Sequence, residues 1–141
     1  TIHPETEVAQ VTDWNKGIVN TLASTALGGL VNTLTSDSLI AKMIQKVLTA
    51  TGVKYNIDQN GYICFGSLFG GLIIQWIISA NENTYNTVPL TGYSKLCELA
   101  IHKTGSTGLF AVSMRDAGND KCYIVSNNGT DSASYWVGIF M

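Results

Sequence analysis

The sequence predicts a mainly β protein, an antiparallel β-sandwich preceded by a short helical stalk. Two patterns predict this class. Apolar residues recur at helical spacing as far as Gly52, and after it short apolar runs alternate with segments rich in Asn, Asp, Gly, Ser and Thr. Hydrophobic residues make up 45% of the 141 residues, which is enough for a folded core. We therefore divide the chain into a stalk, residues 1–52, and a β domain, residues 53–141.

The first part of the stalk has the apolar spacing of an amphipathic helix. The residues that carry this spacing are Val8, Val11, Trp14, Ile18, Leu22, Leu27, Leu30, Val31 and Leu34. The pair Gly28-Gly29 lies inside the pattern, and glycine weakens a helix interior. We therefore expect two or more helical pieces with an interruption at these glycines, and no single long rod.

The second helix of the stalk has clearer ends. Thr35-Ser36-Asp37 offers an N-cap, and Gly52 offers a C-terminal stop. One apolar stripe runs between them: Leu39, Ile40, Met43, Ile44, Val47 and Leu48. Its spacing fits a short coiled-coil seam, and it equally fits an amphipathic helix that lies on its own domain. The sequence leaves both alternatives open.

After Gly52 the pattern changes to strands. The segments VKYNI and YICF flank Asp58-Gln59-Asn60-Gly61, and Asn-Gly between two such segments predicts a β-hairpin. Five further strands are predicted at residues 72–79, 96–103, 109–115, 121–126 and 133–141. The segments between them, NENTYNT, KTGSTG, DAGND and SNNGTDS, have the composition of turns. Strands at this spacing predict an antiparallel sandwich or barrel.

Three predicted strands, at residues 72–78, 109–114 and 135–140, are apolar on successive positions. A strand with one solvated face would alternate apolar and polar residues. One apolar face fills the domain's own core, and the other needs a cover. Neighbouring copies of the same chain would provide it, which predicts an oligomer; a single-chain barrel is the alternative. Within the first of these strands, we expect Trp76 to be buried, with its indole N–H bonded to a backbone or neighbouring polar atom.

Composition excludes several classes of protein. Charged residues make up only 13% and the net charge is −2, so no basic stripe is present to follow nucleic-acid phosphates. The longest apolar run, residues 70–78, is shorter than the ~20 residues that span a bilayer, so we expect no membrane insertion. The first ten residues have no signal-peptide pattern. Because the chain does not begin with Met, we expect it to be part of a longer protein.

The three cysteines give no sign of a metal site or a disulfide framework. Cys64, Cys97 and Cys122 are odd in number, lie far apart and form no C-x-x-C pair. We expect all three to be small core residues in a protein that is assembled in a reducing cytoplasm.

Signals for catalysis are sparse. His3 and His102 have no second His at ligand spacing, and the sequence contains no G-x-S-x-G motif. Asp116, Asp120 and Asp131 fall in predicted turns, where a solvated aspartate is the usual explanation. No glycine-rich loop precedes a helix in the arrangement that holds a phosphate. We therefore predict no enzymatic activity, no metal and no cofactor.

The loops of the β domain are the strongest candidates for binding, because recognition usually resides on loops that rigid strands hold. Amides and carboxylates reach the vicinal hydroxyls of a sugar, and Tyr offers an apolar ring with a polar tip. The candidate receptor-binding residues are Tyr85, Asn119, Asp120, Asn127, Asn128, Asp131 and Tyr135. Turn geometry alone explains the same composition, so this alternative stays open.

The stretch from Asn60 to Trp76, NGYICFG followed by GGLIIQW, resembles the start of the C-terminal domain of tail-fibre proteins from tailed phages and prophages. Residues 87–103 resemble that family's proline-led strand, with Pro89 in the proline position, and residues 126–141 resemble its closing strand. The resemblance covers about residues 53–141, and its one specific motif is Gly-Leu-Ile-Ile-Gln-Trp.

Three features depart from the family's pattern. Ser67-Leu68-Phe69 lengthens the link before the glycines, Ile77 stands where the family usually has glycine, and Gly138 is displaced from the terminal glycine. These departures concern local bends and leave the overall fold unchanged.

The resemblance implies a homotrimer at the distal end of a fibre, with the second apolar faces near the threefold axis and residues 1–52 as the end of the shaft. It implies a non-enzymatic, receptor-binding adhesin in the tail fibre of a virion that is assembled in the host bacterial cytoplasm. The receptor would be a bacterial surface glycan or an outer-membrane protein. The alternative is a purely structural, trimerising end-cap of a virion or pyocin-like fibre, and an enzyme acting on surface polysaccharide is the weakest reading.

Overall fold

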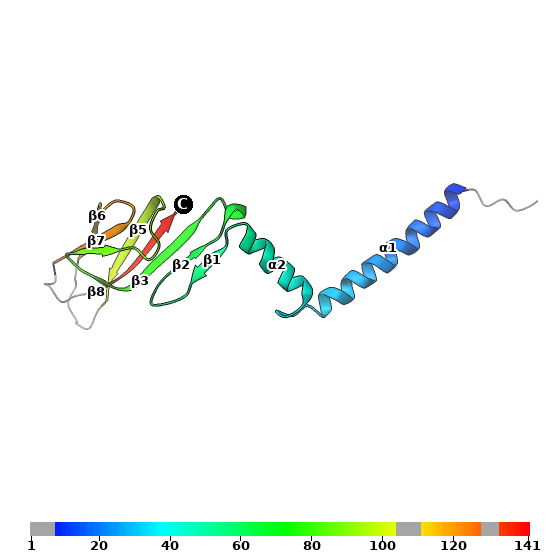
Figure 1. Cartoon of the computed structure of the whole chain (residues 1–141), viewed down its shortest axis with the longest axis horizontal. Helices are drawn as coiled ribbons and strands as arrows, with labels where there is room; N and C mark the ends of the chain where they lie inside the picture. Colours follow the sequence, from blue (N-terminus) through cyan, green and yellow to red (C-terminus); the bar gives the residue numbers. More distant parts are fainter. Residues whose placement is uncertain (1–7, 104–110, 128–132) are drawn as a thin grey trace, which may run out of the picture. The chain divides into compact units, whose positions relative to one another are not determined.

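The structure, a computed structural model, describes residues 8–103, 111–127 and 133–141 (Figure 1). The chain divides into two compact units, Thr1–Gln45 and Lys46–Met141. Helices α1 (Val8–Asn32) and α2 (Leu39–Ala50) precede eight short strands. The predicted class, mainly β with antiparallel sheets after N-terminal helices, is confirmed. The predicted division between residues 52 and 53 stays a prediction.

The helices differ from the sequence prediction at two points. The predicted two helical pieces are present as α1 and α2, but α1 continues through Gly28-Gly29 and the chain leaves it only at Thr33, so the break does not lie at the glycines. A helix tolerates such glycines at a cost of about 1 kcal/mol each relative to Ala. The N-cap of α2 is Ser38, whose hydroxyl accepts a hydrogen bond from the Ala41 N–H at 3.3 Å. The predicted cap at residues 35–37 is therefore wrong by one residue.

The C-terminal end of α2 follows the prediction. Gly52 has a φ of +95°, in the left-handed region that favours glycine. Its N–H donates to the Thr49 carbonyl at 3.1 Å, and the Val53 N–H donates to the Leu48 carbonyl at 2.9 Å. This pair of bonds is a Schellman motif, which satisfies the last helical carbonyls and turns the chain into the first strand.

The strands form two antiparallel sheets. The five-stranded sheet has the order β1 (Lys54–Asn56), β2 (Asn60–Cys64), β3 (Ile73–Asn81), β8 (Ala133–Phe140) and β5 (Lys95–His102). The three-stranded sheet has the order β4 (Tyr85–Thr87), β7 (Lys121–Ser126) and β6 (Val112–Arg115). A short 3-10 helix, η1 (Ser67–Phe69), links β2 to β3. Every strand pair is antiparallel.

Strand β4 was not predicted, because its segment NENTYNT has the composition of a turn. Side-chain amides explain why a strand forms there. The Asn86 side chain accepts from the Asn81 N–H at 2.9 Å and donates to the Asn81 carbonyl at 2.8 Å. It thereby takes the place of a backbone partner at the end of β3. The turn assignment for this segment is therefore wrong in its second half.

The predicted hairpin of β1 and β2 is confirmed, but Asn60-Gly61 lies within β2 and pairs with β3. Gly61 is opposite Trp76, and a Cβ atom on Gly61 would lie 2.6 Å from Cζ2 of the Trp76 ring and 2.2 Å from the Asn56 carbonyl oxygen. Close packing of an indole and a backbone carbonyl therefore requires glycine at this position.

One hydrophobic core is shared by the two sheets. Its buried members are Cys64, Ile73, Ile77, Ala80, Val88, Cys122, Ile124, Trp136 and Phe140. Trp136 and Phe140 pack edge to face with their ring centroids 6.1 Å apart. Gly138 lies between the two rings on the same side of β8, and Val137 and Ile139 point to the opposite side of the sheet, as the two-residue period of a strand requires.

Gln75 is the one polar residue of the Gly-Leu-Ile-Ile-Gln-Trp motif, and it is fully buried. Its Nε2 donates to the Leu90 carbonyl at 2.9 Å, and its Oε1 accepts from the Leu90 N–H at 2.7 Å. The amide therefore pairs with one backbone residue as a neighbouring strand would. This pairing fixes the segment that crosses from the three-stranded sheet to β5 and leaves both polar atoms of the Gln75 amide bonded.

Two of the three cysteines lie in the core. Cys64 and Cys122 are buried, whereas Cys97 is exposed, so its prediction as a core residue is wrong for the single chain. Burial raises the pKa of the Cys122 thiol to about 12. Burial likewise raises the pKa of Cys64. Both thiols therefore stay protonated and unreactive at neutral pH.

Candidate functional site

The five-stranded sheet has a second face, away from the core, that is apolar across every strand. The strand register places ten residues on it, which we call the apolar face: Tyr55, Ile63, Ile74, Trp76, Cys97, Leu99, Ile101, Tyr135, Val137 and Ile139. One row of this face runs without interruption from β1 through β2, β3 and β8 to β5. The prediction that β3 and β8 are apolar on both sides is therefore confirmed.

Much of the apolar face is open in the single chain. Tyr55 is 69% exposed, Ile101 is 62% exposed and Leu99 is 55% exposed. Trp76 is only half-buried, so its predicted burial is wrong for the single chain, although its indole N–H donates to the Asp58 carbonyl at 2.9 Å as expected. Soluble monomers rarely expose a continuous apolar patch of more than a few hundred Å². The apolar face therefore has the character of an interface.

The helices also carry exposed apolar side chains. In α1, Trp14 is 68% exposed and Leu22 is 64% exposed, and in α2, Leu39 is 74% exposed and Met43 is 57% exposed. A stable isolated helix in water presents a mainly polar surface, because exposed apolar side chains gain nothing from folding. Both alternatives for the stalk, a coiled-coil seam and a helix that lies on its own domain, stay predictions.

Two of the candidate binding residues brace the fold. The Asn119 side-chain oxygen accepts from the Lys95 N–H at 2.9 Å, and Asp120 Oδ1 accepts from the Gly92 N–H at 3.0 Å. The turn between β6 and β7 is thereby tied to the segment that leads into β5. Sequence reasoning missed this role, since no local pattern shows which backbone amide a turn side chain will meet.

The other candidates that the structure describes, Tyr85, Asn127 and Tyr135, do not gather into one site. Tyr85 lies in β4, in the three-stranded sheet, and Tyr135 lies on the apolar face of the five-stranded sheet. Asn127 directly follows β7. Asn128 and Asp131 lie outside the described residues. Tyr85 is therefore in a strand and not in the predicted loop.

A buried carboxylate connects three strands at one end of the five-stranded sheet. Glu82 is 3% exposed, and its Oε1 accepts from the Ser134 hydroxyl at 2.7 Å and from His102 Nδ1 at 2.5 Å. Burial opposes ionisation, but the hydrogen bonds from His102, Ser134 and Ser126 prevail and hold the pKa of Glu82 below its usual range. In a hydrolytic relay the His lies between Ser and acid, whereas here Ser134 and His102 flank the acid. This cluster has the geometry of a structural anchor.

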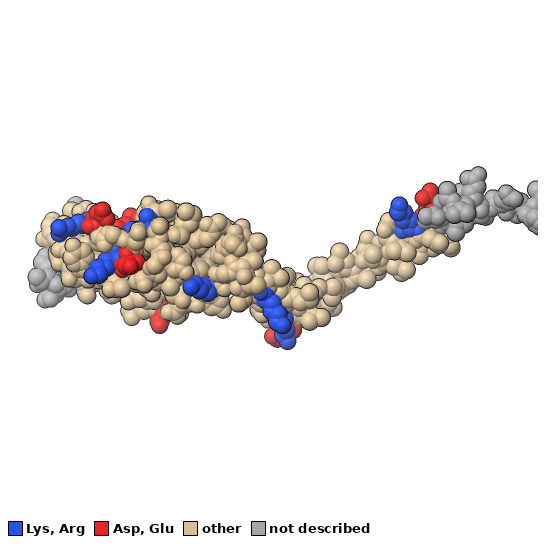
Figure 2. Space-filling view, turned by 45° about the horizontal axis from the view of Figure 1, so that its top comes forward, with Lys and Arg blue, Asp and Glu red and all other residues tan. Residues whose placement is uncertain are grey.

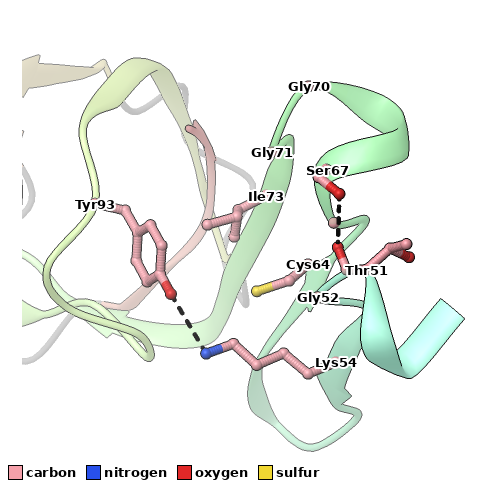
Figure 3. Close-up of a pocket in the computed structure, with 10 residues that line it drawn as sticks. Thr51, Gly52, Lys54, Cys64, Ser67, Gly70, Gly71, Ile73 and Tyr93 are labelled. Carbon is pink, nitrogen blue, oxygen red and sulfur yellow. Dashed lines mark hydrogen bonds between the residues drawn. The ribbon is translucent and has the colours of Figure 1, made fainter. Parts of the chain in front are cut away.

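A pocket of about 430 Å³ lies where the end of α2 meets β2 and the start of β3 (Figure 3). Lys54 Nζ donates to the Tyr93 hydroxyl at 3.3 Å across its mouth, and the Ser67 hydroxyl donates to the Thr51 carbonyl at 3.2 Å. The ten residues that line it include no Asp, Glu or His. The lining therefore offers no carboxylate or imidazole, and burial raises the pKa of its one thiol, Cys64.

Within the described ranges, no group of three or more His, Cys, Asp or Glu side chains is placed to hold a metal ion. Of the two described helices, neither has the length and apolarity that crossing a membrane requires.

No known protein family matches the chain, and no curated protein sequence is similar to it. Solved structures do share its fold. An N-truncated R2-type pyocin tail fibre has a TM-score of 0.51 and 15% identity, over 62% of this chain and 36% of that one. The C-terminal part of the R2 pyocin fibre of Pseudomonas aeruginosa has a TM-score of 0.51 and 15% identity, over 62% of this chain and 25% of that one.

At this identity the likeness is one of fold. The chain spans only about a third and a quarter of the length of these two fibres. Its antiparallel β unit therefore has a fold that occurs in R-type pyocin tail fibres, which agrees with the kind of protein that the sequence resembles. The Gly-Leu-Ile-Ile-Gln-Trp motif as a family signature stays a prediction.

Proposed function

We propose that this chain is the β-sandwich end of a homotrimeric tail fibre, which attaches a phage or phage-like particle to the surface of its bacterial host. It acts by binding and without catalysis, it belongs to the virion, and it is assembled in the host cytoplasm. The observation that carries the proposal is the uncovered apolar face on a domain whose fold occurs in pyocin tail fibres.

Two further copies of the same chain are the occupants that fit the apolar face best. None of the ten residues that define the face is charged, and the one printed cation contact with them is Lys103 Nζ, 5.4 Å from the centre of the Tyr135 ring. Obligate interfaces between identical chains are similarly apolar. The exposed apolar residues of α1 and α2 need a cover of the same kind, which a three-stranded coiled coil would provide. Low charge also fits, because a chain in which only 13% of the residues are charged has few charges to place on the surface of a lone soluble domain.

A charge placed on the apolar face tests the assembly. Ile101→Glu changes a side chain that is 62% exposed in the single chain, so a monomer would tolerate it with little loss. In the trimer the same carboxylate would be buried without a partner, and we expect analytical ultracentrifugation to find dissociated chains. Leu68→Glu is the matched control, because Leu68 is 61% exposed but lies in η1, away from the face. A wild-type monomer at micromolar concentration would refute the trimer.

The predicted receptor-binding residues Tyr85, Asn119, Asp120, Asn127, Asn128 and Asp131 remain part of the proposal, whereas Tyr135 belongs to the apolar face that the trimer would cover. The receptor is a surface glycan or an outer-membrane protein. Each contact with a sugar is individually weak, and three linked copies gain avidity from their high effective concentration.

Binding of fluorescent wild-type protein to host cells tests attachment. Since Asn119 and Asp120 brace the fold, a clean loop variant replaces Asn127, Asn128 and Asp131 by Ala and leaves these two intact. We expect it to lose most cell binding and to remain trimeric.

The matched control for this variant replaces Asp13, Asn15 and Asn20 in α1 by Ala, the same residue types on an exposed helix surface. It should bind cells as the wild type does. A trimeric wild type that binds no tested host strain would instead favour the structural end-cap, and loss of binding only in the α1 variant would move the receptor site to the stalk.

A further inference from the structure

The three-stranded sheet also has an outer face, and its chemistry differs from that of the apolar face. Cys122 and Ile124 of β7 point into the core and are fully buried, so the residues that alternate with them point outward. Tyr123 is one of these, and it is the cross-strand partner of both Tyr85 in β4 and Arg115 in β6.

Two tyrosines and two cations form a continuous row on this outer face. The rings of Tyr85 and Tyr123 meet edge to face with centroids 4.9 Å apart. The Arg115 guanidinium lies 5.1 Å from the centre of the Tyr123 ring, and Lys121 Nζ lies 5.6 Å from the centre of the Tyr85 ring. We call these four residues the tyrosine–cation row. Tyr85 remains 54% exposed, so its contact with Tyr123 leaves much of the side chain open to a ligand.

Neither cation of the row is paired with a carboxylate within residues 8–103, 111–127 and 133–141. Over the same ranges, the one Lys or Arg that forms an ion pair with an acid is Lys95, with Glu98 at 3.0 Å. Figure 2 shows that most charged side chains of the β unit gather at the end that carries β6 and β7. The aspartates in the turn between these strands bond to backbone instead: Asp116 accepts from the Gly118 N–H at 3.0 Å, and Asp120 accepts from the Gly92 N–H.

We propose that the tyrosine–cation row binds an acidic sugar residue, one that carries a carboxylate or phosphate group. The inference rests on the proposed attachment to a bacterial surface glycan and names the class of sugar. A tyrosine ring packs against the apolar C–H face of a sugar, and Arg and Lys supply charge-assisted hydrogen bonds to the acidic substituent. A neutral sugar would offer neither cation an anionic partner, so the row selects for charge.

The row can act in the assembled fibre, because it lies on a different sheet from the apolar face that the trimer would cover. Nucleic acid is a poorer fit for the same cations. The chain carries eight Lys and Arg against ten Asp and Glu, and two cations do not make the extended stripe that follows a phosphate backbone.

Calorimetry on the full-length chain tests the inference with two acidic probes, trigalacturonate for the carboxylate and mannose 6-phosphate for the phosphate. The neutral probes are the methyl ester of trigalacturonate and free mannose. We expect an acidic probe to bind and its neutral counterpart to bind at least about fivefold more weakly, with affinity falling as salt is raised. Arg115→Gln with Lys121→Gln keeps the side-chain stems and should remove this preference, while Tyr85→Ala should weaken all binding.

Lys42→Gln with Lys46→Gln in α2 is the matched control, and it should bind as the wild type does. A wild type that binds acidic and neutral probes equally would overturn the inference, and so would a variant of Arg115 and Lys121 that keeps the wild-type preference for acidic probes. Absence of binding to either acidic probe would overturn it as well. The proposed attachment is judged separately by cell binding. A wild type that binds cells but shows no charge preference refutes the tyrosine–cation row alone, and a wild type that binds acidic probes but no cells refutes attachment alone.

Discussion

Replacing Gln75 by Leu should destabilise the β unit by about 2 kcal/mol per chain. The substitution removes two hydrogen bonds, of 2.9 Å and 2.7 Å, and leaves the Leu90 N–H and carbonyl without a partner in a partly buried position. Each unsatisfied buried group costs about 1–3 kcal/mol. Because Leu90 is only partly buried, we take about 1.5 kcal/mol for each of its two backbone groups, which gives a loss of about 3 kcal/mol. Burial of a more apolar side chain offsets about 1 kcal/mol of it.

Urea unfolding followed by tryptophan fluorescence measures the change, at one protein concentration and on samples of equal oligomeric state. For a domain of this size, 2 kcal/mol corresponds to a fall of about 10 °C in Tm. Gln59→Leu is the control, because Gln59 is exposed in the hairpin turn and should change stability by less than about 0.5 kcal/mol. If Gln75→Leu is as stable as Gln59→Leu, the two hydrogen bonds between the Gln75 amide and the Leu90 backbone do not stabilise the β unit.

Three other experiments test the packing and the buried groups. Gly61→Ala should lower the free energy of unfolding by at least about 3 kcal/mol, because the backbone cannot retreat from the added methyl group. Gly28 has open space around it, so Gly28→Ala should stabilise α1 by up to about 1 kcal/mol. Thermal unfolding followed by circular dichroism compares the two variants with the wild type. The pKa of Glu82 is lowered on folding, so the stability that this carboxylate contributes is present above its unfolded pKa and is lost as pH falls through the folded pKa. Glu82→Gln should therefore flatten the loss of stability as pH falls below the ordinary pKa of Glu, and an unchanged slope there would contradict this. Iodoacetamide at pH 8 should leave the buried Cys122 unmodified in any folded state, and it should modify Cys97 only in dissociated chains. Peptide mass spectrometry measures the labelling of each cysteine. Fast labelling of Cys97 in the native assembly would argue against the apolar face as the interface.

Local chemistry determined most of the elements. The end of α2 was predictable because a Schellman motif involves only neighbouring residues, here Leu48 to Val53. Gly52 readily adopts the left-handed conformation that this motif requires. Strand β7 has the bounds that its alternation predicts, residues 121–126. The apolar character of both faces of β3 was also readable, because the two-residue period assigns each side chain to a face without knowledge of the partner strand.

Non-local contacts decided what the sequence could not. Asn60-Gly61 reads as a turn, but the reason for the glycine is an indole fifteen residues away that packs on it from the neighbouring strand. Tyr85 reads as a loop residue because NENTYNT is polar, yet Asn86 provides the missing backbone partner and makes a strand. In both cases the local composition is compatible with two structures, and a contact between distant segments selects one.

The candidate site shows the same division. The sequence by itself determined that the chain is poor in charge, apolar on both sides of its strands and furnished with polar loops, because these are sums and periods along the chain. Only the tertiary structure decided that Asn119 and Asp120 brace the fold, and that Tyr85, Tyr123, Arg115 and Lys121 form one row. Strand order and register bring these four side chains together from three strands. The register is set by the burial of Cys122 and Ile124 in the core, because a shift by one residue would move both side chains to the solvent face. No property of the four residues themselves decides it.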